Sequence, residues 1–356
     1  MDTTQTIRQA GEDDATGAPA RGLRRVGRRL VRVIAGLMLA GALILLAAIA
    51  SGGEANLLLV LLAALSGWVL PLVLVAGGLF ALTRWWRATA VAAVVALVAA
   101  GALLQLPDLA RDARAASSRG VLTPLTVMSL NVEIGGANAR QLVDRVRQER
   151  PDVLVLTELT PEAVARFHAA GLDDVLPHAF ARPGPNALGT GIWTREPLTG
   201  QRQIPGTTYA ALVGTLTVAG RPVTIAGVHP NAPTDLARWQ SDYRILAEVL
   251  GARAVSATGS WGEVVAGDFN SAVTNGPLAR LLDTGLQDGA LRGPSPLAPW
   301  FGAGQTWPAD YPIPPVIRID HVLTDRGSAV QSFDTFRIAD TDHLGVIATV
   351  GLSLGG

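Results

Sequence analysis

The sequence predicts an α+β domain, in which two sheets pack face to face with helices outside, preceded by three transmembrane helices. Two observations lead to this prediction. Residues 33–106 are almost continuously apolar, whereas residues 124–356 have the composition of an ordinary globular domain, in which strand-like hairpin patterns mix with amphipathic helix patterns. We therefore expect a disordered cytoplasmic tail (1–30), three transmembrane helices (31–106), a linker (107–123) and one globular domain (124–356).

The predicted spans are the apolar runs 33–50, 57–82 and 88–106. Each run meets or approaches the roughly 20 residues that cross a bilayer. None has the polar face that a helix of a soluble domain would present to water. Pro71, in the second run, is expected to kink its helix, which transmembrane helices tolerate.

The placement of arginine predicts the orientation of these spans. Arginines at positions 21, 24, 25, 28, 29 and 32 precede the first span, and the loop between the second and third spans carries Arg84 and Arg87. The loop after the first span carries only Glu54. Both arginine-bearing segments should stay in the cytoplasm of a bacterial cell, which places the globular domain on the extracytoplasmic face of a multi-pass membrane protein.

Within the globular domain, short apolar runs predict strands and one long amphipathic pattern predicts a helix. The expected strands are 125–132, 153–156, 264–266, 317–323 and 346–352, with a hairpin formed by 211–219 and 223–228. The expected helix is 236–250, and a shorter helix carries Leu142, Val143 and Val146 on one face.

Composition limits the chemistry. The chain contains no cysteine, which excludes disulfides, thiolate catalysis and cysteine-based metal sites. From residue 107 onward, 20 arginines stand against 24 acidic residues, a net charge of about −4 (20 − 24). A protein that grips a long nucleic acid usually has a basic face. The composition therefore disfavours a nucleic-acid partner, without excluding one.

Polar residues stand just past the ends of the predicted strands. Because strand ends are rigid and reach the surface, such residues can converge on one pocket. Carboxylates and amides suit a hard cation such as Mg²⁺, and the scarcity of histidine argues against a dedicated zinc cage. The candidates are Asn131, Glu158, His229, Asp268, Asn270, Asp320, Asp342 and His343.

Seven short motifs containing these residues follow one another along the chain: Ser129-Leu130-Asn131-Val132, Thr157-Glu158-Leu159, Gly191-Ile192, Val228-His229-Pro230, Gly267-Asp268-Phe269-Asn270, Arg318-Ile319-Asp320-His321 and Thr341-Asp342-His343. Together they resemble the signature series of the endonuclease/exonuclease/phosphatase (DNase I-like) superfamily, over residues 124–352. The resemblance implies a four-layered α/β sandwich and a hydrolase that cleaves phosphoester bonds with Mg²⁺ or Mn²⁺.

The resemblance also implies a role for each matching residue. Glu158 looks like the metal-binding glutamate, with Asn131 beside it on the metal or the phosphate, and Asp342 lies near the metal. Asp268 resembles the residue that orients or deprotonates the attacking water, and Asn270 and His229 resemble phosphate-binding residues, with His229 also a catalytic candidate. His343 resembles the catalytic histidine, whose ring Asp320 would orient.

The resemblance indicates the type of bond that is cleaved more clearly than the identity of the substrate. A domain tethered at the bilayer meets membrane substrates at high effective concentration, so a phosphate ester or pyrophosphate of a cell-envelope lipid is expected. The three-span layout resembles actinobacterial membrane proteins associated with teicoplanin resistance, a form of antibiotic resistance. Alternatives are a membrane-tethered extracellular nuclease and a non-catalytic envelope or drug-binding module. No protein partner is indicated, and pocket-lining and core roles both stay open for His321, Trp300 and Trp307.

Overall fold

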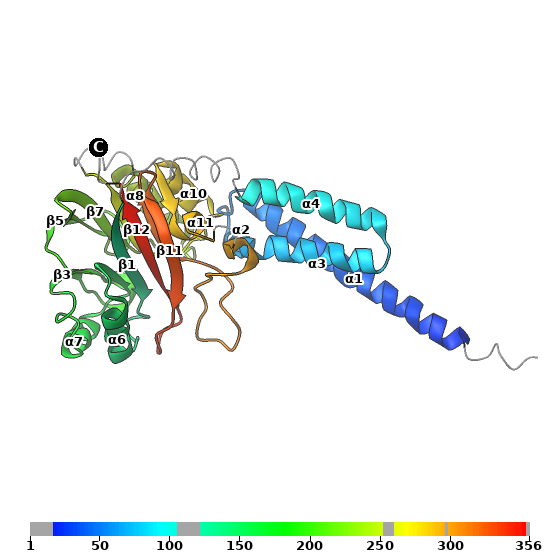
Figure 1. Ribbon diagram of the computed structural model, residues 1–356, viewed down its shortest axis with the longest axis horizontal. Helices are drawn as coiled ribbons and strands as arrows, with labels where there is room; N and C mark the ends of the chain where they lie inside the picture. The colour runs from blue at the N-terminus through cyan, green and yellow to red at the C-terminus, as the bar shows by residue number, and fades with distance from the viewer. Residues whose placement is uncertain (1–16, 105–121, 252–259, 296–297, 354–356) are drawn as a thin grey trace, which may run out of the picture.

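The computed structural model describes residues 17–104, 122–251, 260–295 and 298–353. An apolar helical bundle stands at one end of a two-sheet domain (Figure 1). Its helices are α1 (Gly17–Ala50), α2 (Leu57–Ala64), the 3-10 turn η1 (Leu65–Trp68), α3 (Val69–Leu82) and α4 (Trp86–Leu104). The described residues contain three apolar stretches long enough to cross a membrane: Arg24–Ala50, Leu57–Leu82 and Trp86–Leu103.

Small residues line the contacts inside the bundle. Ala35 and Ala42 of α1, Ala76 of α3 and Ala92 of α4 are buried together with Phe80. Leucines and valines on the outer faces of the same helices are exposed. Small residues inside and large apolar residues outside are typical of helices that pack in lipid, where close backbone approach holds the helices together.

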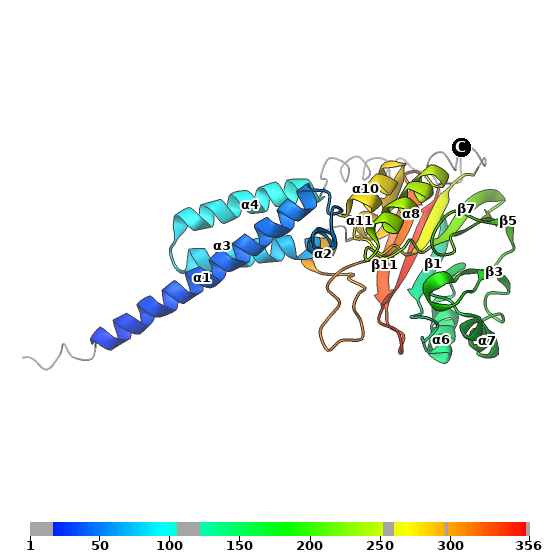
Figure 2. The same ribbon diagram turned by 180° about the vertical axis from the view of Figure 1, so that it is seen from behind.

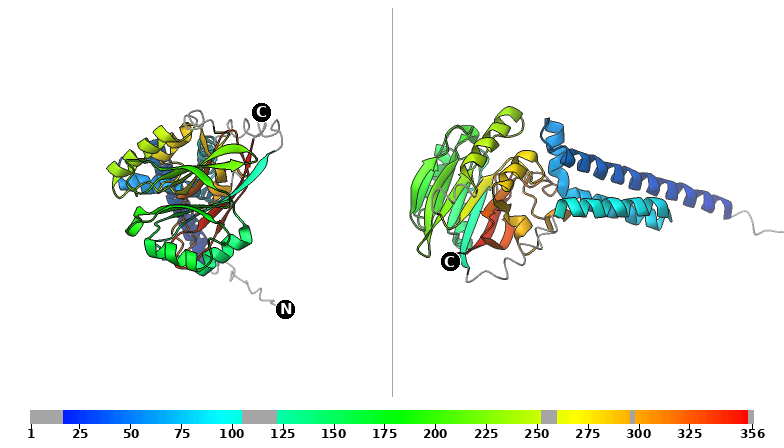
Figure 3. Two further views of the ribbon diagram at one scale, coloured as in Figure 1. Left: turned by 90° about the vertical axis from the view of Figure 1, so that its left-hand side faces the viewer. Right: turned by 90° about the horizontal axis from the view of Figure 1, so that it is seen from above.

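The bundle differs from the sequence prediction in two places. Helix α1 begins at Gly17, so residues 17–30 are helical rather than disordered, whereas residues 1–16 and most of the predicted linker (105–121) lie outside the described residues. The second apolar run is broken by η1, and α2 lies across the end of the bundle rather than along α3 (Figures 2 and 3). Pro71 explains the break, because a proline in the first turn of α3 prevents the helix from continuing backward.

The globular domain is built on two six-stranded mixed sheets. The first has the order β11-β12-β1-β2-β4-β3, and the second β5-β6-β7-β8-β10-β9. Their bounds are β1 Thr123–Asn131, β2 Val153–Thr157, β3 His178–Arg182, β4 Thr190–Thr194, β5 Leu198–Gln203, β6 Leu212–Val218, β7 Arg221–Val228, β8 Glu263–Asp268, β9 Leu286–Asp288, β10 Asp320–Asp325, β11 Ala329–Phe336 and β12 Gly345–Leu352.

Helices cover the outer face of each sheet. One buried cluster, which includes Val127, Ile225 and Val264, lies between the two sheets. A second joins the first sheet to α6 (Ala139–Glu149) and α7 (Pro161–Ala169), and a third joins the second sheet to α8 (Leu236–Val249) and α10 (Gly276–Asp283). The short α11 (Gly289–Arg292) contacts β10 and β11. This helix–sheet–sheet–helix order is the four-layered sandwich expected, so that prediction of the fold is confirmed.

Strand direction brings the candidate residues to one edge. Strands β1 and β2 are parallel, as are β7 and β8, so Asn131, Glu158, His229 and Asp268 lie at carboxyl ends. Strands β10 and β12 run antiparallel to these neighbours and begin at the same edge, next to Asp320 and His343. Both sheets therefore contribute to one site.

Two side chains of the globular domain, Asn275 and Arg280, bind the end of the bundle, and we call these contacts the clasp. The buried amide of Asn275 donates to the carbonyls of Gly53 (3.2 Å) and Val60 (3.1 Å). Arg280 forms a two-bond ion pair with Glu54, at 3.0 and 2.6 Å. These contacts join α10 and its N-terminal turn to residues 51–64, which comprise the turn after α1 and α2 and are called the α2 hairpin below. The domain is therefore held by direct packing as well as by the chain connection.

Candidate active site

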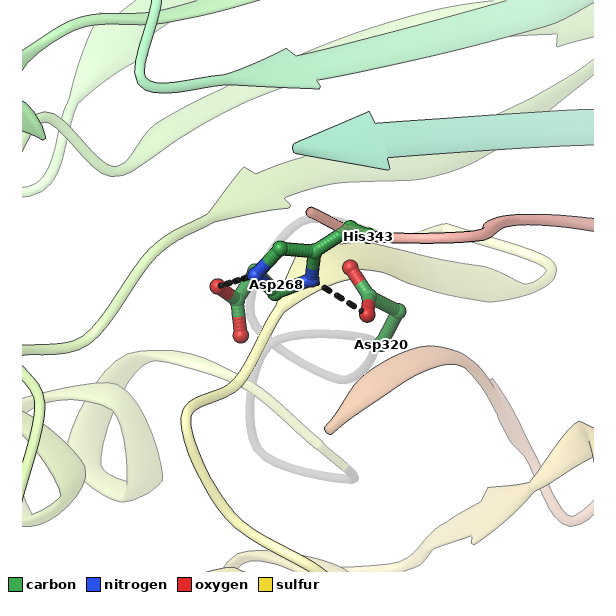
Figure 4. A group of neighbouring side chains, drawn as sticks. All are labelled: Asp268, Asp320 and His343. Carbon is green, nitrogen blue, oxygen red and sulfur yellow. Dashed lines mark hydrogen bonds and ion pairs between the residues drawn. The ribbon is translucent and has the colours of Figure 1, made fainter. Parts of the chain in front are cut away.

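Asp268, His343 and Asp320 form the centre of the site. The imidazole of His343 lies between the two carboxylates (Figure 4), with Nδ1 2.8 Å from Asp320 Oδ2 and Nε2 3.7 Å from Asp268 Oδ2. All three side chains are buried. The glycine before Asp268 is required, because a Cβ at Gly267 would lie 1.9 Å from the carbonyl oxygen of Val228.

This arrangement keeps His343 charged. Burial alone lowers the pKa of His343, but the negative charges of Asp320 and Asp268 and the hydrogen bond to Asp320 raise it to about 10. For the carboxyl of Asp268, burial alone raises the pKa. The charge of His343 and the contact with His229 nevertheless hold this pKa well below its usual range. The pair at neutral pH is therefore an imidazolium beside an ionised Asp268.

Glu158 and Asn131 form the second part of the site. The Asn131 amide donates to Glu158 Oε1 (3.0 Å) and to Asp268 Oδ2 (2.9 Å), so it bridges the two carboxylates. Glu158 Oε2 accepts from the backbone of Ile134 at 2.9 Å. Glu158 has a φ of 55°, in the left-handed region that residues other than glycine seldom adopt.

The crowding of carboxylates fits a divalent cation. Burial raises the pKa of Glu133, and repulsion from Asp342, Asp310 and Glu158 raises it further. A cation held by Glu158 and Asn131, with Asp342 nearby, would relieve this repulsion, and one or two carboxylates with waters are a typical Mg²⁺ environment. Asp268, Asp320 and His343 also have ligand atoms within 4.8 Å of one another. A protonated His343 already hydrogen-bonded at Nδ1 has no lone pair for a metal, which favours the Glu158 side.

His229 and Asn270 also lie next to Asp268. The two side chains are 3.1 Å apart, between Asn270 Nδ2 and His229 Nε2, and His229 Nε2 lies 3.5 Å from Asp268 Oδ2. Asn270 also donates to the carbonyl of Pro230 at 3.0 Å. The eight residues chosen from the sequence thus lie around one centre.

Two further residues at the centre, Tyr209 and Glu133, were not predicted from the sequence, and Trp307 was left open between a pocket and a core role. The ring of Tyr209 packs against His229 with centroids 4.7 Å apart, and Glu133 lies in the carboxylate cluster. Trp307, for which the sequence left core and pocket roles open, donates from Nε1 to Asp342 Oδ2 at 3.0 Å. Glu133 stands two residues past the end of a strand, and this position could have predicted that it belongs to the site. Tyr209 lies in a loop between strands and has no such signal.

The two remaining open residues have structural surroundings. His321 is fully buried, with Nδ1 2.5 Å from Asp288 Oδ2 and Nε2 2.9 Å from the carbonyl of Ser271. It therefore supports the segment behind Asp268 rather than lining the site. Trp300 packs among Leu45, Val69 and Leu103 at the end of the bundle.

Comparison with known proteins agrees with this geometry. A family model described as the Endonuclease/Exonuclease/phosphatase family matches residues 128–343. A search of curated proteins finds no match.

Several solved structures share the fold of the globular domain. An endonuclease/exonuclease/phosphatase from Beutenbergia cavernae is 22% identical, with a TM-score of 0.52 over 65% of this chain and 72% of that chain. TDP2 from D. rerio, complexed with single strand DNA product, is 19% identical, with a TM-score of 0.53 over 64% of this chain and 99% of that chain. TDP2 from Caenorhabditis elegans is 17% identical, with a TM-score of 0.53 over 67% of this chain and 80% of that chain. At these identities the likeness concerns the fold.

Proposed function

Because the chain belongs to the endonuclease/exonuclease/phosphatase family, whose members are metal-dependent hydrolases of phosphoester bonds, we propose that it hydrolyses a phosphate ester or pyrophosphate of a membrane lipid. The protein is anchored by its three apolar helices and works on the extracytoplasmic face. By the resemblance to teicoplanin-resistance proteins, the lipid is a cell-envelope intermediate such as a polyprenyl phosphate.

One observation carries the lipid assignment. The segment that holds Asp268 and Asn270 continues, within five residues of Asn270, into Thr274 and Asn275. Thr274 donates to the carbonyl of Ala63 at 2.7 Å, and Asn275 holds the α2 hairpin. The catalytic segment is thus attached directly to the end of the apolar bundle, which suits a substrate that resides in the bilayer.

The side chains divide the chemistry between them. His343, held at Nδ1 by Asp320, has its Nε2 proton available for a phosphoryl oxygen, because Nε2 lies beyond ordinary hydrogen-bond distance of Asp268 and Asp342 (3.7 and 3.8 Å). Asp268, kept ionised, accepts a hydrogen bond from the attacking water and so aims the lone pair of that water at phosphorus. Asn270 and His229 bind the phosphate oxygens.

The metal would be held by Glu158 and Asn131, with Asp342 nearby. When bound, a divalent cation neutralises negative charge on the phosphoryl group. Asn131 then links this part of the site to Asp268, since its amide contacts both carboxylates.

The test is a substrate panel with the full-length chain purified in detergent, with Mg²⁺, beside an Asp268→Ala/His343→Ala double variant. The panel holds undecaprenyl phosphate and pyrophosphate, sphingomyelin, a phosphoinositide, bis-p-nitrophenyl phosphate and plasmid DNA. Phosphate or head-group release from a lipid, lost in the variant and with EDTA, is the expected result. Cleavage of plasmid alone would replace the proposal with a membrane-tethered nuclease.

A further inference from the structure

Residues 298–316, the juxtamembrane segment, connect the catalytic domain to the bundle at two points. The segment begins with η3 (Ala298–Phe301), which packs against η1 and α3 and buries Trp300 among the helix ends. At its other end, the carbonyl of Val316 accepts from Trp68 Nε1 at 2.9 Å. The segment is therefore fixed beside the end of the bundle.

Large apolar side chains are exposed on this segment. Phe301, Tyr311 and Ile313 are 50%, 61% and 55% exposed. The other exposed large apolar residues in the described part of the globular domain, Ile134, Leu188 and Trp261, stand on separate elements. Among the exposed residues 310–314, Asp310 is the only charged one. Such a concentration of apolar surface marks a contact with lipid or another protein.

The position of the segment favours lipid. Its loop lies near α2, at the end of the bundle that faces the globular domain, as Figures 1 and 2 show. Helix α2 crosses the end of the bundle, with Leu58 (65%) and Leu61 exposed, while Val60 and Ala63 are buried toward the catalytic domain. The exposed loop thus continues the surface at which the three apolar helices end.

The composition of the loop suits an apolar surrounding. In Tyr311-Pro312-Ile313-Pro314-Pro315, three of five residues have no backbone N–H, so few donors would lose water on entering lipid. Tyrosine, with an apolar ring and a polar hydroxyl, is enriched where bilayer meets water.

We propose that Tyr311 and Ile313, together with Phe301, enter the head-group region of the bilayer that holds the three helices. This contact rests on the proposed membrane anchoring and adds a second site of lipid contact outside the bundle. The contact also fixes the position of the active site relative to the bilayer. Trp307 donates to Asp342 at 3.0 Å, and the N–H of Ala309 donates to the carbonyl of Asp342 at 2.7 Å. The loop in lipid then sets the level at which a lipid phosphate meets Asp342 and His343.

The absence of cysteine allows a direct test. Tyr311→Cys, Ile313→Cys and Thr217→Cys full-length chains each receive one polarity-sensitive fluorophore. Thr217 is an exposed residue of β6, whose sheet edge is far from the bundle in Figure 1, and serves as the matched control. The chains are reconstituted into phosphatidylcholine/phosphatidylglycerol vesicles with and without lipids that carry a nitroxide at the head group or upper acyl chain. Thermal unfolding checks that each variant is folded.

The expected result is an emission shift to shorter wavelength at residues 311 and 313, with several-fold stronger nitroxide quenching there than at residue 217. Equal, weak quenching at all three positions would overturn the proposal. A shifted but unquenched label at 311 and 313 would also overturn it and indicate a protein contact instead. Because quenching needs no turnover, the result is independent of whether the proposed lipid hydrolysis is found.

Discussion

Asp268 and Asp320 lie directly opposite one another in the antiparallel pairing of β8 with β10. Two buried carboxylates at such a position would repel each other, and like charges across strands are destabilising. The imidazolium of His343 between them offsets the repulsion. The same contact that makes the pair tolerable holds a charged donor at the site.

Asp320→Asn should lower turnover roughly 10²-fold or more, because His343 loses the partner that holds its ring and its proton. The Asp320 charge is the largest contribution that raises the pKa of His343 to about 10. Its removal should therefore shift the alkaline limb of the kcat/KM profile to lower pH. The measurement is a pH–rate profile on whichever phosphoester the panel identifies. Asp283→Asn, at an exposed aspartate of α10, is the control and should leave the profile unchanged.

Glu158→Gln should weaken metal binding, since the variant retains the shape of the side chain and loses its charge. The Mg²⁺ concentration for half-maximal activity should rise, and the gain in Tm on adding Mg²⁺ should shrink. Both are measured in one metal titration. An unchanged Mg²⁺ dependence would remove Glu158 from the metal site and leave Asp268, Asp320 and His343 as the candidates.

Glu263 predicts a pH dependence of stability remote from the site. Burial raises its pKa to about 8, only partly offset by the hydrogen bond from the N–H of Gly251 (2.7 Å). With a folded pKa above the unfolded value, its contribution is fully present below about pH 4.5 and is lost as pH rises through about 8, a change of a few kcal/mol. Glu263→Gln should flatten Tm between pH 5 and 8, whereas Glu248→Gln, at an exposed glutamate, should not.

The clasp predicts unequal costs for two substitutions. Asn275→Ala removes a buried amide that donates to the carbonyls of Gly53 and Val60, which should cost about 1–3 kcal/mol. Arg280→Ala removes an ion pair whose guanidinium is half exposed, which should cost about 0–1 kcal/mol. Thermal unfolding of the full chain in detergent compares the two. A larger loss for Arg280→Ala would mean that the ion pair, and not Asn275, holds the hairpin.

Ile134 predicts a stabilising substitution. This β-branched residue has a φ of 52°, a conformation that costs about 1–3 kcal/mol. Ile134→Asn should raise the free energy of unfolding, because asparagine adopts the left-handed region readily. Ile134→Val, which keeps the branch, should not. Chemical unfolding of both variants distinguishes relief of backbone strain from any effect of side-chain size.

The ends of the strands could be predicted because a few neighbouring residues in the sequence indicate them. An apolar run followed by Asn131 or Asp268 indicates both a strand and where it ends, and strand direction then brings the ends together. Tyr209 reaches the site through a loop, and no pattern near it indicates this. The second apolar run could not be divided from hydropathy, because α2 and α3 are equally apolar. Only Pro71 hinted at the break, and the hydrogen bonds from Asn275 and Thr274 that hold α2 across the bundle come from residues over 200 positions away.

The clasp by which Asn275 and Arg280 hold the α2 hairpin has a kinetic consequence. For the lipid substrate that we propose, an enzyme fixed in this way would encounter its substrate by lateral diffusion within one leaflet. Its rate should follow the mole fraction of substrate among the surrounding lipids rather than the amount in the whole sample. Diluting the vesicles with buffer would then leave the rate per enzyme unchanged, whereas diluting the membrane with inert lipid would lower it.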